Sequence, residues 1–370
     1  MADERGHVSA MDDFAVHQAP ELLATVATTD PNFFERFYFN LFSHSDDLFM
    51  IVGLGQYPNR GLMDAYAIAV RHGVQHSLRS SVVFDGDRQS TRVGPLEVEI
   101  LAGTRIVRVR ADAHAGSPIE FDLTWRADIA PYLEQRTHAM AGPRTTDDGQ
   151  RFVQTGRWEG SLRLGEEFFP ITPARFWGAR DRSWGLRRLA DSVPLVPFRR
   201  TSFTSFFTWA PMQFEDYTVL YASFEDAKGV PERRSSHLVG RLPSEEVSDL
   251  GATDHQLMFV PGSRRLAGGT ISFAAPHPDV EIEALTRLCL DKGSGYGQSE
   301  AWQHGAYVGD SVVECSSTPQ VELFPTSRID ACLCRFRRGD DVGYGVFDTT
   351  IVGDHVKYPL ETAAPGAAGS

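Results

Sequence analysis

The stretch Ile119-Glu-Phe-Asp-Leu-Thr-Trp125 decides the fold class, because its side chains alternate between apolar and polar. On a β-strand its apolar side chains share one face and Glu120, Asp122 and Thr124 share the other. The same period of two recurs in residues 95–101 (PLEVEIL) and 105–110 (RIVRVR). This alternation is typical of antiparallel strands with one buried and one solvated face.

Further short strands are predicted on both sides of this region, and turn residues separate them about every ten positions. They cover residues 34–42, 48–54, 63–70, 205–209, 218–224, 237–242, 256–260, 269–273, 311–315, 331–336 and 343–351. Only residues 19–27 and 244–250 show a helical pattern. A doubly wound α/β fold needs helices between most strands, so we expect an all-β protein built from antiparallel barrels or open sandwiches.

A chain of 370 residues is long for a single core and suits two domains. Residues 191–200 (DSVPLVPFRR) carry two prolines and no alternation, so we place the junction there. The expected division is a β domain over 21–195 and a second over 196–360. Residues 1–20 and 361–370 are expected to be flexible tails.

The composition excludes several classes of function. A net charge of −13 argues against nucleic acid or an anionic membrane surface as partner. No apolar run is long enough for a membrane span and no secretory leader is visible, so we expect a cytoplasmic protein. The four cysteines form no C-x-x-C pair and are expected to be free thiols. Nucleotide-loop, zincin and hydrolase motifs are absent, and we expect no metal and no cofactor.

Residues 180–187 (RDRSWGLR) are the strongest candidate for chemistry. A carboxyl group at Asp181, close to the indole of Trp184, can line a half-buried pocket that holds it in a chosen protonation state. The alternative is a structural ion pair between Asp181 and an arginine such as Arg182, with Trp184 as packing. An arginine partner would lower the pKa of the aspartate and make it a base or an anchor instead of an acid.

Other candidates are single side chains with a structural reading beside the functional one. Tyr57 and Arg60, in a Pro-Asn turn, are candidates for a barrel mouth. His76, four residues after His72, is a candidate for proton transfer, and His304 is a candidate to enter a cavity from the second domain. Trp209 and Gln213 follow the junction and are candidate binding residues. The glycines of residues 154–160 (QTGRWEG) indicate close backbone approach within strands.

The pattern Gln154-x-Gly156-x-x-x-Gly160 with Gly165, followed by Asp181-Arg182-x-Trp184-Gly185, resembles that of the AttH-like, carotenoid 1,2-hydratase superfamily. Residues 57–61 and 210–214 are similar to bacterial proteins of that group, and the resemblance spans about residues 30–358. It implies two lipocalin-like β-barrels packed side by side around an apolar cavity. Hydratases of the group often carry His where this chain has Arg182, so only Asp181, Trp184 and Gly185 carry over.

Relatives of this kind hydrate isoprenoid double bonds, cyclise tocopherol-type precursors or close rings without a cofactor. The resemblance therefore implies a cofactor-free lyase, cyclase or isomerase for a hydrophobic isoprenoid- or polyketide-like molecule. Asp181 would be its acid, and Trp184 would stabilise a cation. The alternatives are a carrier that binds a lipophile without chemistry and a scaffold domain with no ligand. An enzyme should place a titratable group with a displaced pKa in the cavity, whereas a carrier should have an almost wholly apolar one. A homodimer is one option for the assembly.

Overall fold

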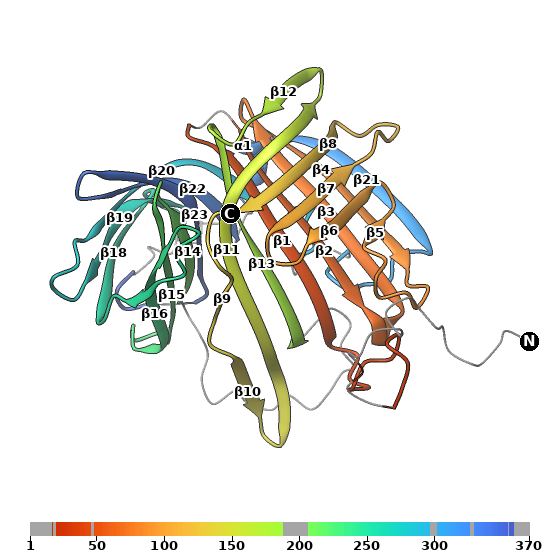
Figure 1. Cartoon of the computed structure of the whole chain (residues 1–370), viewed down its shortest axis with the longest axis horizontal. Helices are drawn as coiled ribbons and strands as arrows, with labels where there is room; N and C mark the ends of the chain where they lie inside the picture. The colour runs from red at the N-terminus through yellow and green to blue at the C-terminus, as the bar shows by residue number, and fades with distance from the viewer. Residues whose placement is uncertain are drawn as a thin grey trace, which may run out of the picture.

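The computed structural model describes residues 17, 20–45, 48–187, 206–296, 302–325, 329–353 and 355–358. Within these ranges the chain forms two antiparallel sheets (Figure 1), so the predicted all-β class is confirmed. The expected junction at 191–200 and the tail at 361–370 lie outside the described residues. So does the tail at 1–20, apart from His17 and Pro20.

The first sheet has 14 strands among the described residues, in the order β21-β4-β3-β2-β1-β13-β11-β8-β7-β6-β5, with β9, β10 and β12 also paired to β11. Its strands are β1 (Phe33–Ser43), β2 (Phe49–Tyr57), β3 (Leu62–Arg71), β4 (Val74–Val83), β5 (Arg92–Val93), β6 (Leu96–Ala102), β7 (Ile106–Ala111), β8 (Ile119–Ala127), β9 (Tyr132–Leu133), β10 (Thr137–Ala141), β11 (Arg144–Leu164), β12 (Glu167–Ile171), β13 (Phe176–Arg187) and β21 (Ser311–Pro319).

The second sheet has nine strands among the described residues, in the order β17-β16-β15-β14-β23-β22-β20-β19-β18. They are β14 (Phe206–Gln213), β15 (Tyr217–Glu225), β16 (Pro231–Gly240), β17 (Val247–Asp249), β18 (Thr253–Phe259), β19 (Leu266–Phe273), β20 (Val280–Cys289), β22 (Asp330–Arg338) and β23 (Asp341–Ile351). The sheets do not follow the chain in order, because β21 crosses back and pairs with β4 of the first sheet.

The helices predicted at 19–27 and 244–250 are wrong. Residues 20–27 form turns and bends, and Val247–Asp249 pairs with β16 as an edge strand. Helices this short have little stability of their own, so neighbouring contacts decide their conformation. The helices present in the described ranges are the 3-10 turn η2 (Pro58–Arg60) and α1 (Gln320–Leu323). None of the described helices is long and apolar enough to span a membrane.

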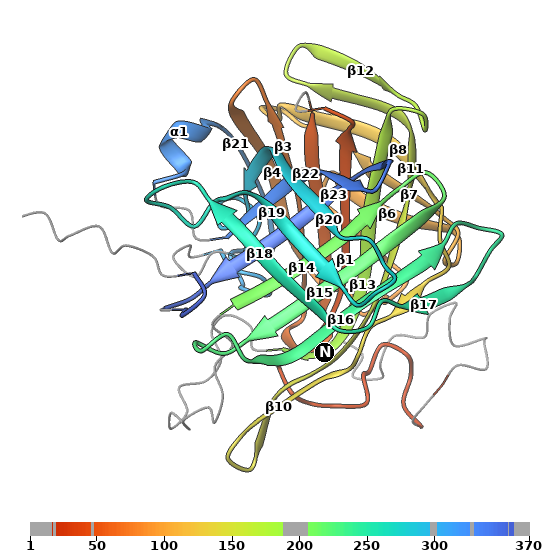
Figure 2. The ribbon, with the colours of Figure 1, turned by 90° about the vertical axis from the view of Figure 1, so that its left-hand side faces the viewer.

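Each sheet curls around its own apolar core, and a third core lies between the two sheets. The apolar side chains of 119–125 are buried inside the first sheet, as predicted. The core between the sheets joins Tyr38, Ile51 and Trp177 of the first to Trp209 and Val346 of the second. Figure 2 shows the second sheet lying across β1 and β13. Strand β2 is therefore buried along its whole length, since both of its faces meet a core.

Strand β11 passes close to β8, and glycine makes that approach possible. Gly160 has a φ of +132°, and a Cβ added there would collide with the carbonyl oxygen of Asp122 on β8. The glycines of residues 154–160 thus serve the close strand contact that their spacing indicated. The cysteines are free, and Cys332 and Cys334 share one buried face of β22 with their sulfur atoms 3.7 Å apart.

Candidate functional site

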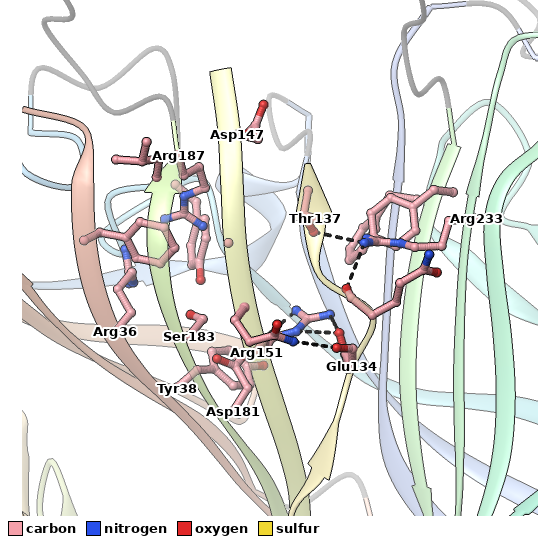
Figure 3. Close-up of a pocket in the computed structure, with 18 residues that line it drawn as sticks. Arg36, Tyr38, Glu134, Thr137, Asp147, Arg151, Asp181, Ser183, Arg187 and Arg233 are labelled. Atoms are coloured by element: carbon pink, nitrogen blue, oxygen red, sulfur yellow. Dashed lines mark hydrogen bonds and ion pairs between the residues drawn. The ribbon is translucent and has the colours of Figure 1, made fainter. Parts of the chain in front are cut away.

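A cavity of about 280 Å³ opens between the two sheets (Figure 3). Strands β1, β11 and β13 and the β9–β10 segment form one side, and β14–β16 form the other. Its lining includes Phe34, Arg36, Tyr38, Glu134, Thr137, Asp147, Gly149, Arg151, Asp181, Ser183, Arg187, Phe207, Phe224, Arg233 and Tyr296. The wall is therefore a mixture of aromatic rings and charged groups, and the expectation of an apolar cavity is wrong.

The register of three neighbouring strands builds the floor of the cavity. Residues directly opposite one another on β1, β13 and β11 form rows, with side chains of neighbouring strands about 5 Å apart. The rows are Tyr38–Asp181–Val153, Arg36–Ser183–Arg151 and Phe34–Gly185–Gly149. Ser183, Gly185 and Gly149 are small, so the middle of the floor stays open while larger side chains stand around it.

Asp181 is the titratable group that the sequence placed in this cavity, and it does line it. Its side chain is 13% exposed, and the nearest cationic atom is Arg151 Nη1 at 4.0 Å. No hydrogen bond from the described residues reaches its carboxyl group. Burial raises the pKa of Asp181 above its ordinary value, and the charge of Arg151 only partly opposes this.

Arg151 opposes the rise in the pKa of Asp181 only in part, because its guanidinium is already paired with Glu134. Its Nε donates to Glu134 Oε2 at 2.8 Å, and its Nη2 donates to the same oxygen. The other oxygen of Glu134 accepts a hydrogen bond from the indole of Trp209 at 2.9 Å, and the Arg151 guanidinium lies 5.2 Å from that ring. Glu134 is thus a fixed counter-ion held from both sheets, and among the described residues Asp181 has no such partner.

Arg36 is buried at the other end of the same row, with 3% of the residue exposed. Its Nη1 donates to the hydroxyl of Tyr57 at 3.3 Å, and that hydroxyl donates to Asp64 at 3.0 Å. The guanidinium also lies 5.3 Å from the centre of the Tyr296 ring. Its Nη2 is buried and has no hydrogen-bond partner among the described residues.

A second buried carboxyl group lies close to the cavity, in the core between the sheets. Asp348, on β23 opposite Trp209, faces the core between the sheets together with Val346. Burial raises its pKa to about 7, the charge of Arg151 opposes the rise, and the negative charge of Asp181 adds to it. Its Oδ1 has no hydrogen-bond partner among the described residues. The two aspartates therefore influence each other's protonation.

The lining carries a surplus of positive charge, although the whole chain is acidic. Among the described residues, four guanidinium groups line the cavity (Arg36, Arg151, Arg187 and Arg233) against three carboxyl groups (Glu134, Asp147 and Asp181). Arg233 reaches in from β16 and donates to Thr137 Oγ1 at 2.9 Å (Figure 3). Protonation of Asp181, which its raised pKa favours, would increase the surplus, because a protonated carboxyl group carries no charge.

Arg182 and Trp184 do not face this cavity, and the expected pairing of acid and indole in one chamber is wrong. Side chains alternate along β13, so residues one and three positions after Asp181 point to the opposite face. Arg182 pairs with Glu35, which also binds Arg88, and its guanidinium lies 4.3 Å from the centre of the Phe37 ring. Trp184 lines a second cavity of about 430 Å³ beneath residues 21–27.

The remaining candidates lie outside the cavity lining. His76 contacts Ser317 Oγ through Nδ1 at 2.8 Å, and burial lowers its pKa. His72 lies in the exposed turn beyond it and so does not share a cavity with it. His304 is buried against Tyr296, with its Nε2 2.7 Å from the Ser294 carbonyl oxygen, and burial puts its pKa well below the ordinary value.

Two further candidates link separate parts of the chain. Arg60 donates to the carbonyl oxygens of Pro31 and Gly305 at 2.8 and 3.0 Å. Gln213 donates to Asp128 Oδ2 and to the Gly156 carbonyl oxygen at 2.9 and 3.2 Å, which ties β14 to the first sheet. Trp209 and Tyr57 are closer to the cavity, since each contacts a residue of its lining. The Trp209 indole donates to Glu134, and the Tyr57 hydroxyl accepts from Arg36.

Most residues of the cavity wall escaped sequence reasoning. Arg36 carried a visible signal, since it shares a strand face with the aromatic residues Phe34 and Tyr38. Arg151 and Glu134 carried none, because their place depends on which strands pair. Within the described ranges, no three side chains of His, Cys, Asp or Glu come together in a way that could hold a metal ion.

Comparisons with known proteins agree with this architecture. The model of the Family of unknown function (DUF8625) matches residues 8–361. Kievitone hydratase from Nectria haematococca superposes with a TM-score of 0.51 at 13% identity, covering 85% of this chain and 88% of that one. A protein described as AttH from Nitrosomonas europaea superposes with a TM-score of 0.54 at 10% identity, covering 86% and 92%. No curated protein matches the sequence. The AttH-like fold that the motifs indicated is confirmed.

Proposed function

We propose that this chain, which belongs to the Family of unknown function (DUF8625), is a cofactor-independent lyase or isomerase that moves a proton on a small organic molecule in the cavity between its sheets. The proposal rests on the environment of the Asp181 carboxyl group. This group lies in the cavity wall with a raised pKa and no hydrogen bond from the described residues, next to guanidinium groups that remain charged.

The proton chemistry follows from the environment of Asp181. Because burial raises the pKa of Asp181 toward the working pH, its carboxyl group is a better general acid than an ordinary aspartate, and its conjugate base can take the proton back. In a hydration, Asp181 gives its proton to one carbon of a double bond, water adds to the other carbon, and the water's proton returns to the carboxylate. The reverse sequence eliminates water. If the carboxylate instead takes a proton from a different carbon of the protonated skeleton, the double bond is isomerised and Asp181 regains its proton.

The charges of the cavity favour a substrate whose transition state becomes negative. A guanidinium about 5 Å from a developing charge acts on it with roughly 3 kcal/mol at an effective dielectric constant of 20. The contact of an aromatic ring with a cation is worth about 0.5–2 kcal/mol. Repulsion from the arginines therefore outweighs aromatic stabilisation of a carbocation, and attraction favours an enolate. We propose a conjugated carbonyl compound of polyketide type in preference to an unactivated isoprenoid alkene.

One solved structure of this fold, kievitone hydratase, has a name that agrees with the addition or removal of water. At 13% identity that structure supports only the shape of the scaffold and does not decide the reaction of this chain. The carrier alternative is weakened by the charged wall, because a carrier for a lipophile would need few polar groups. The cytoplasmic location and the homodimer remain predictions.

The test is a turnover assay on matched variants. Purified protein is incubated in D₂O with a panel of α,β-unsaturated and β-hydroxy carbonyl compounds, and mass spectrometry follows gain or loss of water and uptake of deuterium. Asp181→Asn should abolish turnover, with the free energy of unfolding within about 1–2 kcal/mol of wild type. Asp340→Asn, in an exposed turn, should keep full activity.

Three results would contradict the proposal. Full turnover by Asp181→Asn would remove the acid from the mechanism. Failure of that variant to fold would assign the residue to structure. Binding of panel compounds without turnover would favour the carrier.

A further inference from the structure

We propose that the ligand of the cavity is a hydrophobic organic acid and that the guanidinium of Arg36 binds its carboxylate. This inference rests on the proposed function for the choice of cavity and goes further in naming the substrate class. It is carried by the geometry of Arg36 and of the groups that stand around Ser183 on the floor.

One N–H donor of the Arg36 guanidinium is buried and has no acceptor among the described residues. Its Nη1 is taken by the Tyr57 hydroxyl at 3.3 Å, whereas the buried Nη2 has no partner among the described residues. Asp64 does not pair with it directly, because Tyr57 stands between them and the other carboxyl oxygen of Asp64 accepts the Gly305 N–H at 2.7 Å. A buried guanidinium N–H without an acceptor is costly, and a carboxylate is the planar acceptor that it fits.

The neighbours of Arg36 complete a receptor for an anion. Ser183 lies directly opposite on β13, and its short side chain leaves room above it. Arg187, further along the same strand, lies over the Phe34 ring at 4.9 Å and forms no ion pair within the described ranges. Both residues line the cavity with Arg36. A carboxylate above Ser183 would therefore meet two guanidinium groups that no carboxyl group of the described chain pairs with.

The rest of the wall defines the other half of the ligand. Phe34, Phe207, Phe224 and Tyr296 line the cavity and offer aromatic surface to an apolar body. The site is local, since a chain with a net charge of −13 otherwise repels anions. An acid group joined to an unsaturated apolar skeleton matches both halves, and anchoring at Arg36 would place the skeleton beside Asp181.

The experiment compares two probes that differ only in charge. Isothermal titration calorimetry measures 1-naphthylacetate and 1-naphthylacetamide on the full-length protein. Wild type should bind the acid at least tenfold more tightly than the amide. Arg36→Gln and Arg187→Gln should each weaken binding of the acid by about tenfold to a hundredfold. Their affinity for the amide should stay within about twofold of the wild-type value.

Arg163→Gln is the matched control. Arg163 has a half-exposed side chain beside Glu120, outside this cavity, so its loss should leave both affinities unchanged. If circular dichroism shows that Arg36→Gln does not fold, the less buried Arg187 carries the test. Equal affinities for the two probes, or a preference that survives both arginine substitutions, would overturn the proposal.

The outcome is separable from that of the proposed function. No preference for the acid, combined with loss of turnover in Asp181→Asn, would refute the substrate class and leave the reaction standing. A clear preference for the acid, combined with full turnover by Asp181→Asn, would support the substrate class and refute the proposed reaction.

Discussion

Replacing Asp348 by asparagine should make the protein more stable above neutral pH. Burial raises the pKa of this carboxyl group from 3.8 to about 7. A group whose pKa is higher in the folded than in the unfolded protein makes its full contribution to stability when the pH is below the lower of the two pKa values. That contribution is lost as the pH rises through the higher one. Each pKa unit corresponds to about 1.36 kcal/mol, so about three units give at most about 4 kcal/mol.

The assay is urea unfolding between pH 4 and pH 8, with Asp340→Asn as the control. The free energy of unfolding of Asp348→Asn minus that of wild type should be near zero at pH 4. It should grow as the pH rises and level off by about pH 8, a window that follows from values of 3.8 and about 7. Asp340→Asn should show no such growth, because its side chain is in an exposed turn.

Coupling to the cavity gives a second readout of the same variant. The negative charge of Asp181 contributes to the raised pKa of Asp348. In an Asp181→Asn background the difference should therefore begin to grow at the same pH, level off at lower pH and reach a smaller plateau. A difference that stays flat across the whole range would refute the reasoning that places an unpaired carboxyl between the sheets.

Two further predictions test the scaffold by chemical denaturation. Gly160→Ala should lose about 2–5 kcal/mol, because its φ is +132° and the new Cβ would meet the Asp122 carbonyl oxygen. Gly165→Ala has open space around it and should lose only about 1–2 kcal/mol, and equal losses would contradict the packing account. Glu35→Gln should lose about 2–3 kcal/mol, since Glu35 pairs with both Arg88 and Arg182 and all three side chains are mostly buried. Glu99→Gln, in a half-exposed pair with Arg108, should lose under about 1 kcal/mol; a loss as large as that of Glu35→Gln would argue against the buried triad.

The strands were predictable because their pattern is local. A period of two in residues such as 119–125 states which side chains are buried, and the structure buries them on one face of β8. Short helices at 19–27 and 244–250 were wrong because so few residues do not form a helix without tertiary support. The crossing of β21 to β4 had no local signal, since pairing between residues more than two hundred positions apart leaves no mark on either segment.

The candidate site was predictable only where a single residue carried it. The motif was enough to place Asp181 at a cavity. It was not enough for Trp184, because side chains alternate along a strand and Trp184 therefore lies on the other face of β13. Applying this alternation to the motif would have separated Asp181 from Trp184. The partners that set the chemistry, Arg36 and Arg151, come from β1 and β11 and meet Ser183 only through strand register. Register is a property of the folded sheet, which explains why the motif alone indicated an acid without its surroundings.

The central claim is that the cavity between the sheets raises the pKa of Asp181 and so favours its protonated, acid form, and the titration of Asp181 tests this most directly. Carbon-13 NMR of aspartate side-chain carboxyl carbons across pH, with the resonance assigned by its loss in Asp181→Asn, measures that pKa. The account predicts a midpoint clearly above the ordinary 3.8. A midpoint at or below that value would show a permanently ionised carboxylate and would contradict the proposed acid.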